Sequence, residues 1–233
     1  MYLKLLSFVF AFLAAGFVDA MVVTNQYLGK APENVRIRKN GTEIPNGGAG
    51  IYLYGNVKGD ICLLIGREKG SIYCPLAGSS QFKERNIPES FEETARRELW
   101  EESATLYSVQ PEDLKNGDFY FQENKSGGQY LLILLKTSKI LHTKDLVDAQ
   151  KNLKKECYLE KENLVWIPFQ VLLKKKKGEN KLVYKGQIFP LQKQFAHLCD
   201  EDSFRSLLKS ILQKANHNDN NIEKKGDYKR AAF

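Results

Sequence analysis

The chain has 233 residues, of which 42% are hydrophobic and 27% are charged. These values are ordinary for a soluble globular protein, so they exclude collagen-like, coiled-coil and wholly disordered chains. Lys and Arg total 35 against 28 Asp and Glu, and the resulting net charge of +7 favours anionic partners such as phosphorylated substrates, nucleic acids or acidic lipid surfaces.

Residues 1–20 have the pattern of a secretory signal peptide. A single cation, Lys4, precedes an apolar run from Leu5 to Val18, and Val18-Asp19-Ala20 has small or apolar residues at the processing positions. The run is shorter than the roughly 20 residues that span a bilayer. We therefore expect cleavage after Ala20, export to the periplasm or the exterior, and no stable membrane span in the mature chain. A membrane anchor and a buried strand are the alternatives.

Beta structure is expected early in the chain, after a leading segment at residues 21–46 that is a linker or a strand. Strands are expected at residues 51–57, 61–65, 71–74, 118–122, 129–136 and 164–167. Lys58-Gly59-Asp60 separates the first two, which predicts a hairpin. The segment 129–136 is nearly all apolar, which is typical of a central strand.

Helices are expected at residues 90–103, 144–155 and 168–173, and over most of the remainder up to residue 215. The first one begins at Ser90, which forms a capping-box pattern with Glu93. Residues 216–233 are polar and are expected to be disordered. Strands, one central helix, more strands and then helices predict a single α+β domain over residues 47–215, with helices packed on a mixed sheet.

The four cysteines form no C-x-x-C pair, so the sequence predicts neither a zinc knuckle nor a redox motif. They are Cys62, Cys74, Cys157 and Cys199. Cys62 lies in an apolar run, where a free buried thiol is expected, although an oxidising compartment would permit disulfides.

The helix at residues 90–103 gathers three carboxylates on one face. Glu98, Glu101 and Glu102 stand at positions i, i+3 and i+4, within a single turn. Like charges at this spacing destabilise a helix by roughly 0.2–0.5 kcal/mol per pair, so the cluster is either a solvated acidic face or a site for a bound cation. Carboxylates on a rigid helix suit Mg²⁺, which takes its other ligands from water and substrate phosphates.

Two features are expected to hold this acidic face in place. Phe91, Ala95 and Leu99 recur every four residues and give the helix an apolar stripe that faces the core. Glu89 precedes the helix and can fold back toward Arg97, so that their ion pair fixes the loop against the helix.

These residues resemble the Nudix box, whose form is G-x5-E-x7-R-E-U-x-E-E-x-G-U with U apolar. The matching positions are Glu89, Arg97, Glu98, Leu99, Glu101 and Glu102. The order of elements over roughly residues 50–173 is also similar to that family. The resemblance implies an α/β/α sandwich in which the mixed sheet carries the Nudix helix at about residues 90–103.

Three positions depart from the box. Its two glycines fall on Lys83 and Ala104, and its last apolar position falls on Thr105. In the family the first glycine belongs to a loop that helps to hold metal, and a basic side chain there is expected to meet a substrate phosphate instead. Ala104 predicts a helix end without the left-handed glycine cap. The Pro-Gly-Gly that precedes the box corresponds to Pro75-Leu76-Ala77-Gly78.

The resemblance implies hydrolysis of a diphosphate linked to a nucleoside or a similar group, with Mg²⁺ or Mn²⁺ neutralising the bridging phosphates. Position by position, the metal ligands would be Glu98, Glu101 and Glu102. One of them, or a carboxylate outside the box, would be the general base. Glu89 and Arg97 would support the loop. Glu160 and Glu162 lie where some members carry a further acidic group.

Substrate identity is weakly encoded. Five aromatic residues could stack on a base or belong to the core: Tyr52, Tyr54, Phe82, Trp100 and Tyr130. The four lysines at residues 174–177 could meet a polyanion such as RNA or form a solvated loop. Two functions remain open. One is an exported Nudix pyrophosphohydrolase acting on a nucleotide-linked small molecule, and the other is a Nudix-shaped module that has lost turnover through Lys83 and binds a phosphorylated ligand.

Overall fold

The computed structural model describes residues 20–37, 43–68, 70–83, 86–123 and 127–230. The predicted signal peptide therefore lies outside the described residues, apart from Ala20. Among the described residues, no helix combines the length and the apolar character needed to cross a bilayer.

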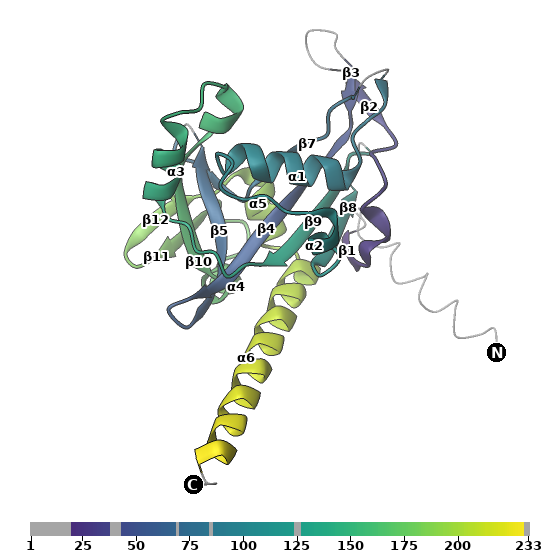
Figure 1. Cartoon of the computed structure of the whole chain (residues 1–233). Helices are drawn as coiled ribbons and strands as arrows, with labels where there is room; N and C mark the ends of the chain where they lie inside the picture. The colour runs from purple at the N-terminus through teal and green to yellow at the C-terminus, as the bar shows by residue number, and fades with distance from the viewer. Residues whose placement is uncertain (1–19, 38–42, 69, 84–85, 124–126, 231–233) are drawn as a thin grey trace, which may run out of the picture.

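The core of the fold is an 8-stranded mixed sheet (Figure 1). Its strands are β1 (Ala20–Val23), β4 (Gly47–Val57), β5 (Asp60–Glu68), β6 (Tyr73–Cys74), β7 (Ala77–Ser79), β8 (Asp118–Glu123), β9 (Gln129–Lys136) and β10 (Lys161–Pro168). The main path runs in the order β1-β8-β9-β4-β5-β10, with β6 on β5 and β7 on β4. Only β4 and β9 pair in parallel among these strands. The mixed sheet and the central position of β9 confirm the predictions.

Two small antiparallel hairpins lie outside this sheet. They pair β2 (Val35–Ile37) with β3 (Glu43–Pro45) and β11 (Lys181–Tyr184) with β12 (Gln187–Pro190). The prediction of mostly helical structure after residue 173 is wrong for β11 and β12. Lys185 and Gly186 both have positive φ, +50° and +74°, as do Lys58 and Gly59 in the predicted hairpin, +55° and +94°. This backbone favours a tight hairpin turn, and the repeated Lys-Gly pair was the sequence signal for it.

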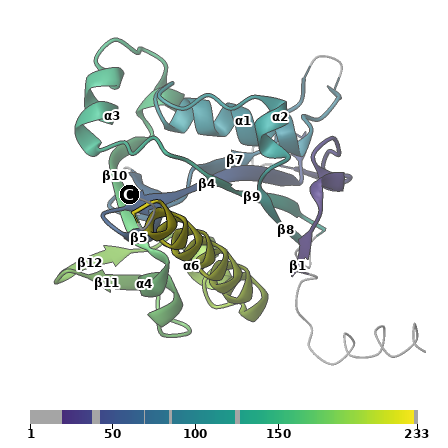
Figure 2. The same cartoon turned by 60° about the horizontal axis from the view of Figure 1, so that its bottom comes forward.

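Helices cover both faces of the sheet and confirm the α/β/α sandwich (Figure 2). They are α1 (Phe91–Glu102), α2 (Pro111–Leu114), α3 (Thr143–Gln150), α4 (Phe169–Lys174), α5 (Lys193–Leu198) and α6 (Asp202–Arg230), with short 3-10 helices η2 (Asn25–Tyr27) and η4 (Glu156–Leu159). Residues of α1, α2 and α3 pack into one hydrophobic core, and residues of α4, α5 and α6 pack into the other. The stripe Phe91, Ala95 and Leu99 is fully buried, as predicted.

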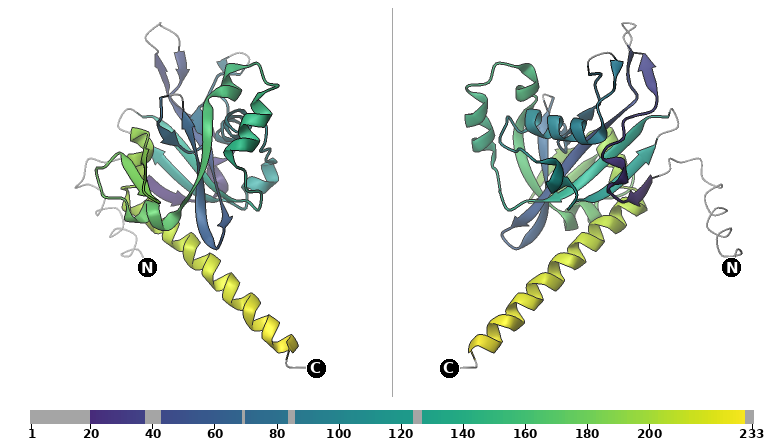
Figure 3. Two further views of the ribbon diagram at one scale, coloured as in Figure 1. Left: turned by 90° about the vertical axis from the view of Figure 1, so that its left-hand side faces the viewer. Right: turned by 45° about the vertical axis from the view of Figure 1, so that its right-hand side comes forward.

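At the start of the described chain, β1 pairs with β8, so the leading segment begins with a strand of the sheet, which is one of its two expected alternatives. The other end differs from expectation. The prediction of disorder from residue 216 is wrong up to Arg230, because α6 continues that far and projects away from the sheet (Figure 3). Its first turns are anchored in the core by Phe204 and Leu208. Extending an existing helix avoids the free-energy cost of nucleating a new one, so the polar residues at the end of α6 can be helical without packing against a core.

Candidate active site

The start of α1 is fixed by the predicted capping box. The Ser90 Oγ accepts a hydrogen bond from the Glu93 backbone N–H at 3.2 Å, and the Glu93 carboxylate accepts one from the Ser90 backbone N–H at 2.8 Å. The Lys83 ammonium lies 2.7 Å from the same carboxylate in an exposed ion pair. Lys83 is thus held at the first turn of α1, and its contact with a substrate phosphate stays a prediction.

The end of α1 is left-handed, contrary to the prediction drawn from Ala104. Ala104 and Thr105 have φ of +52° and +67°. The Thr105 backbone N–H donates to the Trp100 carbonyl at 2.7 Å, and the Ala104 N–H donates to the Glu101 carbonyl at 3.0 Å, which is the Schellman motif. The Ala104 methyl group is completely buried in the core, and this packing offsets the strain that glycine would avoid.

Arg97 organises one part of the acidic cluster. Its Nε and Nη2 donate to the two oxygens of Glu89 at 2.8 and 2.9 Å, so the predicted ion pair is present and bidentate. Its Nη1 donates to Glu98 Oε1 at 2.7 Å and to Glu101 Oε2 at 3.0 Å. Its Nη2 also donates to the Ser79 carbonyl at 2.9 Å. One guanidinium therefore joins three carboxylates and the end of β7.

The buried Glu89 carboxylate ties the loop before α1 to the helix. It accepts a hydrogen bond from the Gln81 backbone N–H at 3.1 Å and one from the Thr94 hydroxyl at 3.2 Å. Thr94 in turn shares a hydrogen bond with Ser80 at 2.8 Å. These contacts give Glu89 the supporting role that the resemblance implied.

Glu98 lies against the main chain of β7. A Cβ atom added to Gly78 would lie 2.1 Å from the Glu98 Cδ, so only glycine permits this approach. Burial raises the pKa of the Glu98 carboxyl, the neighbouring Arg97 opposes that shift, and Glu101 and Glu160 add to it. Burial is thus the largest cause of the raised pKa, and the effect of Arg97 exceeds that of either Glu101 or Glu160. Glu160 is close enough to contribute to this potential.

Glu102 lies in a different environment from its two neighbours. It is 3% exposed; its Oε1 lies 2.9 Å from Lys161 Nζ, and its Oε2 accepts a hydrogen bond from the Ala77 backbone N–H at 2.8 Å. The fully buried Lys161 Nζ also lies 2.9 Å from Glu68 Oε1 and 3.0 Å from Cys74 Sγ. Sequence reasoning missed this buried lysine.

Lys161 carries a positive charge in this environment. Burial alone would lower its pKa, but its partners, with Glu102 contributing most, outweigh burial and raise it. The Cys74 thiol is itself neutral, since burial raises its pKa to about 12. All four cysteines are free.

A β-bulge directs Lys161 toward α1. The pairing of β10 with β5 shifts register directly after Lys161. The next inward residues of β10, Leu164 and Trp166, belong to the core beneath α1. Strict alternation would therefore place Glu162 on that face and Lys161 on the other. The extra residue of the bulge reverses the two side chains.

The two acidic residues ahead of Leu164, Glu160 and Glu162, thus have different positions. Glu162 lies at the surface, 3.4 Å from Arg67, and is not part of the cluster. Glu160 acts electrostatically on Glu98, as described above. Of this pair, only Glu160 is placed near the predicted metal ligands.

The donor set partly fits the predicted divalent cation. Among the described residues, no group of three or more His, Cys, Asp or Glu side chains is arranged to hold a metal ion. Both oxygens of Glu102 already have protein partners. Glu98 and Glu101 remain, and two carboxylates are what Mg²⁺ commonly takes from a protein when phosphates supply other ligands. Five carboxyl groups also share two cations here, so carboxyl groups outnumber cations, although burial raises the pKa of Glu102 to about 8.

A cavity of about 510 Å³ adjoins this cluster between the sheet and α5. The β7 residues Ala77 to Ser79 line it, and Gly78 therefore separates the cavity from Glu98. Tyr52 and Tyr130, two of the five predicted stacking residues, are in its wall, together with Arg36 and Phe195. The cavity thus combines aromatic faces with a cation, next to the carboxylates.

Other predicted binding features contact neighbouring residues of the chain. Tyr54 packs against Phe169, with ring centroids 5.7 Å apart, and Trp100 packs edge-on against Tyr158 at 5.2 Å. Within the lysine run at residues 174–177, the second and fourth lysines pair with the residues that lead into α6. These pairs are Lys175 with Asp200 at 2.6 Å and Lys177 with Asp202 at 2.9 Å. An RNA contact by this run remains untested.

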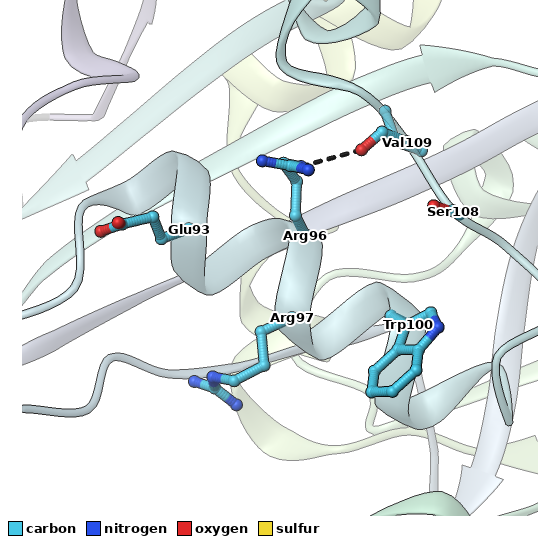
Figure 4. A pocket seen from close by; sticks show the side chains of 6 residues that line it. All are labelled: Glu93, Arg96, Arg97, Trp100, Ser108 and Val109. Atoms are coloured by element: carbon cyan, nitrogen blue, oxygen red, sulfur yellow. Dashed lines mark hydrogen bonds between the residues drawn. The ribbon is translucent and has the colours of Figure 1, made fainter. Parts of the chain in front are cut away.

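A second hollow, of about 390 Å³, runs along α1 and the loop that follows it (Figure 4). The Arg96 Nε donates to the Val109 carbonyl at 2.8 Å and ties this loop to the helix. Arg96 and Arg97 point in different directions, so only Arg97 reaches the carboxylates (Figure 4). Neither Glu98, Glu101 nor Glu102 lines this hollow, and we assign it no substrate.

No family model matches the sequence, and no curated protein is similar enough to count as a match. Among solved structures, the chain is similar to a C. elegans Ap4A hydrolase binary complex at 18% identity, with 73% of this chain and 98% of the other covered and a TM-score of 0.37. It is also similar to the NUDIX domain of Shewanella oneidensis NrtR complexed with ADP ribose, at 14% identity, with 77% and 94% covered and a TM-score of 0.37. Since both TM-scores are below 0.5, these similarities do not extend to function.

Proposed function

We propose that the chain hydrolyses a diphosphate linkage in a nucleoside diphosphate derivative or a related compound, with Mg²⁺ or Mn²⁺ as cofactor. One observation carries the proposal: a single nitrogen, Arg97 Nη1, bonds both Glu98 and Glu101 within a cluster whose carboxylates outnumber its cations. Paired oxygen donors and excess negative charge are the properties that a divalent cation requires of a protein site.

The bound cation would neutralise the bridging phosphates and orient an attacking water. The chain's own residues hold the site in place. Glu89 and Arg97 fix the loop, and Gly78 allows the main chain to approach Glu98. The adjoining cavity would hold the organic part of the substrate, with Tyr52 and Tyr130 as stacking surfaces.

The test is a hydrolysis screen of the pure chain with Mg²⁺ and with Mn²⁺. Substrates are ADP-ribose, dinucleoside polyphosphates, nucleoside triphosphates, NADH and capped RNA. Glu101→Gln is expected to lower turnover about a hundredfold or more, because it removes charge from the cation site; this corresponds to roughly 2.7 kcal/mol of barrier.

Glu92→Gln is the matched control. Glu92 lies on the same helix, pairs with Arg96 at 3.8 Å and is not part of the cluster, so turnover is expected to stay within about twofold. If cleavage occurs and Glu101→Gln and Glu98→Gln both retain it, the box is not the active site.

A module that binds a phosphorylated ligand without turnover is the second candidate. The observation that favours it is Glu102, which the resemblance predicts as a ligand but whose two oxygens are already engaged. This function is supported if neither metal gives cleavage of any substrate while one of the nucleotides raises the melting temperature. A ligand that binds only the folded state must do so.

A further inference from the structure

Lys161 occupies a site that is fully built around one positive charge. Its side chain is 0% exposed, and an ammonium group has three donors and no acceptor. Three partners surround it: Glu102 Oε1 at 2.9 Å, Glu68 Oε1 at 2.9 Å and Cys74 Sγ at 3.0 Å. The partners come from α1, β5 and β6, so three separate elements converge on this one group.

The backbone is shaped to admit this side chain. A Cβ atom at Gly66 would lie 2.9 Å from Lys161 Cδ and 3.0 Å from its Cγ, so the glycine leaves room for the lysine stem. The bulge in β10 turns the same side chain toward α1. Two independent backbone features therefore place Lys161 against Glu102.

A divalent cation has no open position at Glu102. One oxygen faces the ammonium and the other accepts the Ala77 N–H, so a metal ion there would have to expel Lys161 or lie beside its charge. Glu98 and Glu101 differ, because their shared partner Arg97 is partly exposed, with 19% of its side chain accessible.

We propose that Lys161 is a permanent counter-cation of Glu102, supplied by the protein in place of a metal ion. The chain then binds at most one divalent cation in this cluster, through Glu98 and Glu101, and Glu102 is not a ligand. The count of metal ions rests on the proposed function, whereas the assignment of Lys161 does not require turnover.

The experiment counts bound Mn²⁺ from the paramagnetic resonance signal of the free ion, with substrate absent. The full chain is expected to bind no more than one Mn²⁺. Lys161→Met is expected to bind one more, because Glu102 and Glu68 lose their counter-charge. The double variant Lys161→Met/Glu102→Gln should gain no ion and should bind Mn²⁺ within threefold of the unmodified chain.

Two results overturn the proposal. One is a Lys161→Met variant that gains no Mn²⁺, and the other is a double variant that binds Mn²⁺ more than tenfold more weakly than the unmodified chain. If Lys161→Met is unfolded without metal, adding Mn²⁺ is expected to restore its folded circular dichroism spectrum, and failure to restore it also overturns the proposal.

The same experiment separates this inference from the proposed function. An unmodified chain that binds no Mn²⁺ and cleaves nothing, beside a Lys161→Met variant that gains one ion, supports the Lys161 assignment and contradicts the hydrolase. If the unmodified chain hydrolyses a diphosphate but the double variant loses Mn²⁺, the result contradicts the assignment of Lys161 and supports the hydrolase.

Discussion

The acidic cluster on α1 has two halves, each organised by one cation. In the Arg97 half, an arginine side chain that is 19% exposed joins Glu89, Glu98 and Glu101. In the Lys161 half, a lysine side chain that is 0% exposed joins Glu102 to Glu68. Both halves draw on the same turn of the same helix, yet the Arg97 side chain reaches the surface and the Lys161 side chain does not.

The difference follows from the chemistry of the two cations. A guanidinium is a planar fork that can brace several carboxylates along its edges. An ammonium is a compact point charge whose three donors are used up by its neighbours. The Arg97 half is therefore braced but still accessible, and we call it the open half. In the Lys161 half all three ammonium donors are occupied, and we call it the closed half. A carboxylate's position in a motif does not by itself determine which of these environments it occupies.

The largest effect is expected from breaking the closed half. Lys161→Met should lower the free energy of unfolding by about 3–5 kcal/mol in metal-free buffer, because it leaves Glu102 buried without a counter-charge. Urea denaturation measures the change. The double variant Lys161→Met/Glu102→Gln removes both charges and should recover most of the loss. A loss below about 1 kcal/mol in the single variant would mean that the halves do not differ as described.

The open half is probed through Gly78. In Gly78→Ala the new methyl group would overlap the Glu98 carboxylate, which lies at the end of a flexible side chain and can move away. Hydrolysis is therefore expected to fall roughly a hundredfold, the scale of a displacement of about 1 Å in a catalytic group, with little change in stability.

Gly29→Ala is the control for this substitution, since a Cβ there would meet nothing within 4 Å. Its rate should match that of the unmodified chain. Full activity in Gly78→Ala would show that Glu98 does not act from the position beside β7.

The smallest effect is expected at the edge of the cluster. Lys83→Ala removes an exposed ion pair with Glu93, so the free energy of unfolding should change by less than about 1 kcal/mol. A loss above about 2 kcal/mol would mean that this ion pair helps to hold the open half in place. In kinetic assays, a raised KM with unchanged kcat would confirm the predicted contact with a substrate phosphate.

Local sequence patterns were sufficient to predict α1 and its open half. The capping box at Ser90, the apolar stripe and the pairing of Glu89 with Arg97 all depend on residues within two or three turns of one another. Spacing along the chain fixes distance in such a segment, because a helix has constant geometry. The positions of most strands along the chain followed from hydrophobic runs and turn residues in the same way, whereas their order in the sheet was not predicted.

The closed half depends on contacts that spacing does not encode. Lys161 is 93 residues from Glu68 and meets it only because of a bulge, which no local pattern marks. Ala104 takes a left-handed conformation because its methyl group is buried by residues distant in sequence. In both cases tertiary packing overrides the conformation that local propensity favours.

The bulge in β10 also determines how the chain would respond to losing a residue. Deleting Glu162 would leave Lys161 directly before Asn163, so an unbulged strand would still present the lysine to α1. Deleting Lys161 would bring Glu162 to that place and add a negative charge to a buried acidic cluster. Two deletions at adjacent codons, each shortening the strand by the same amount, thus have opposite electrostatic outcomes. In this stretch, changes in chain length are as informative as substitutions.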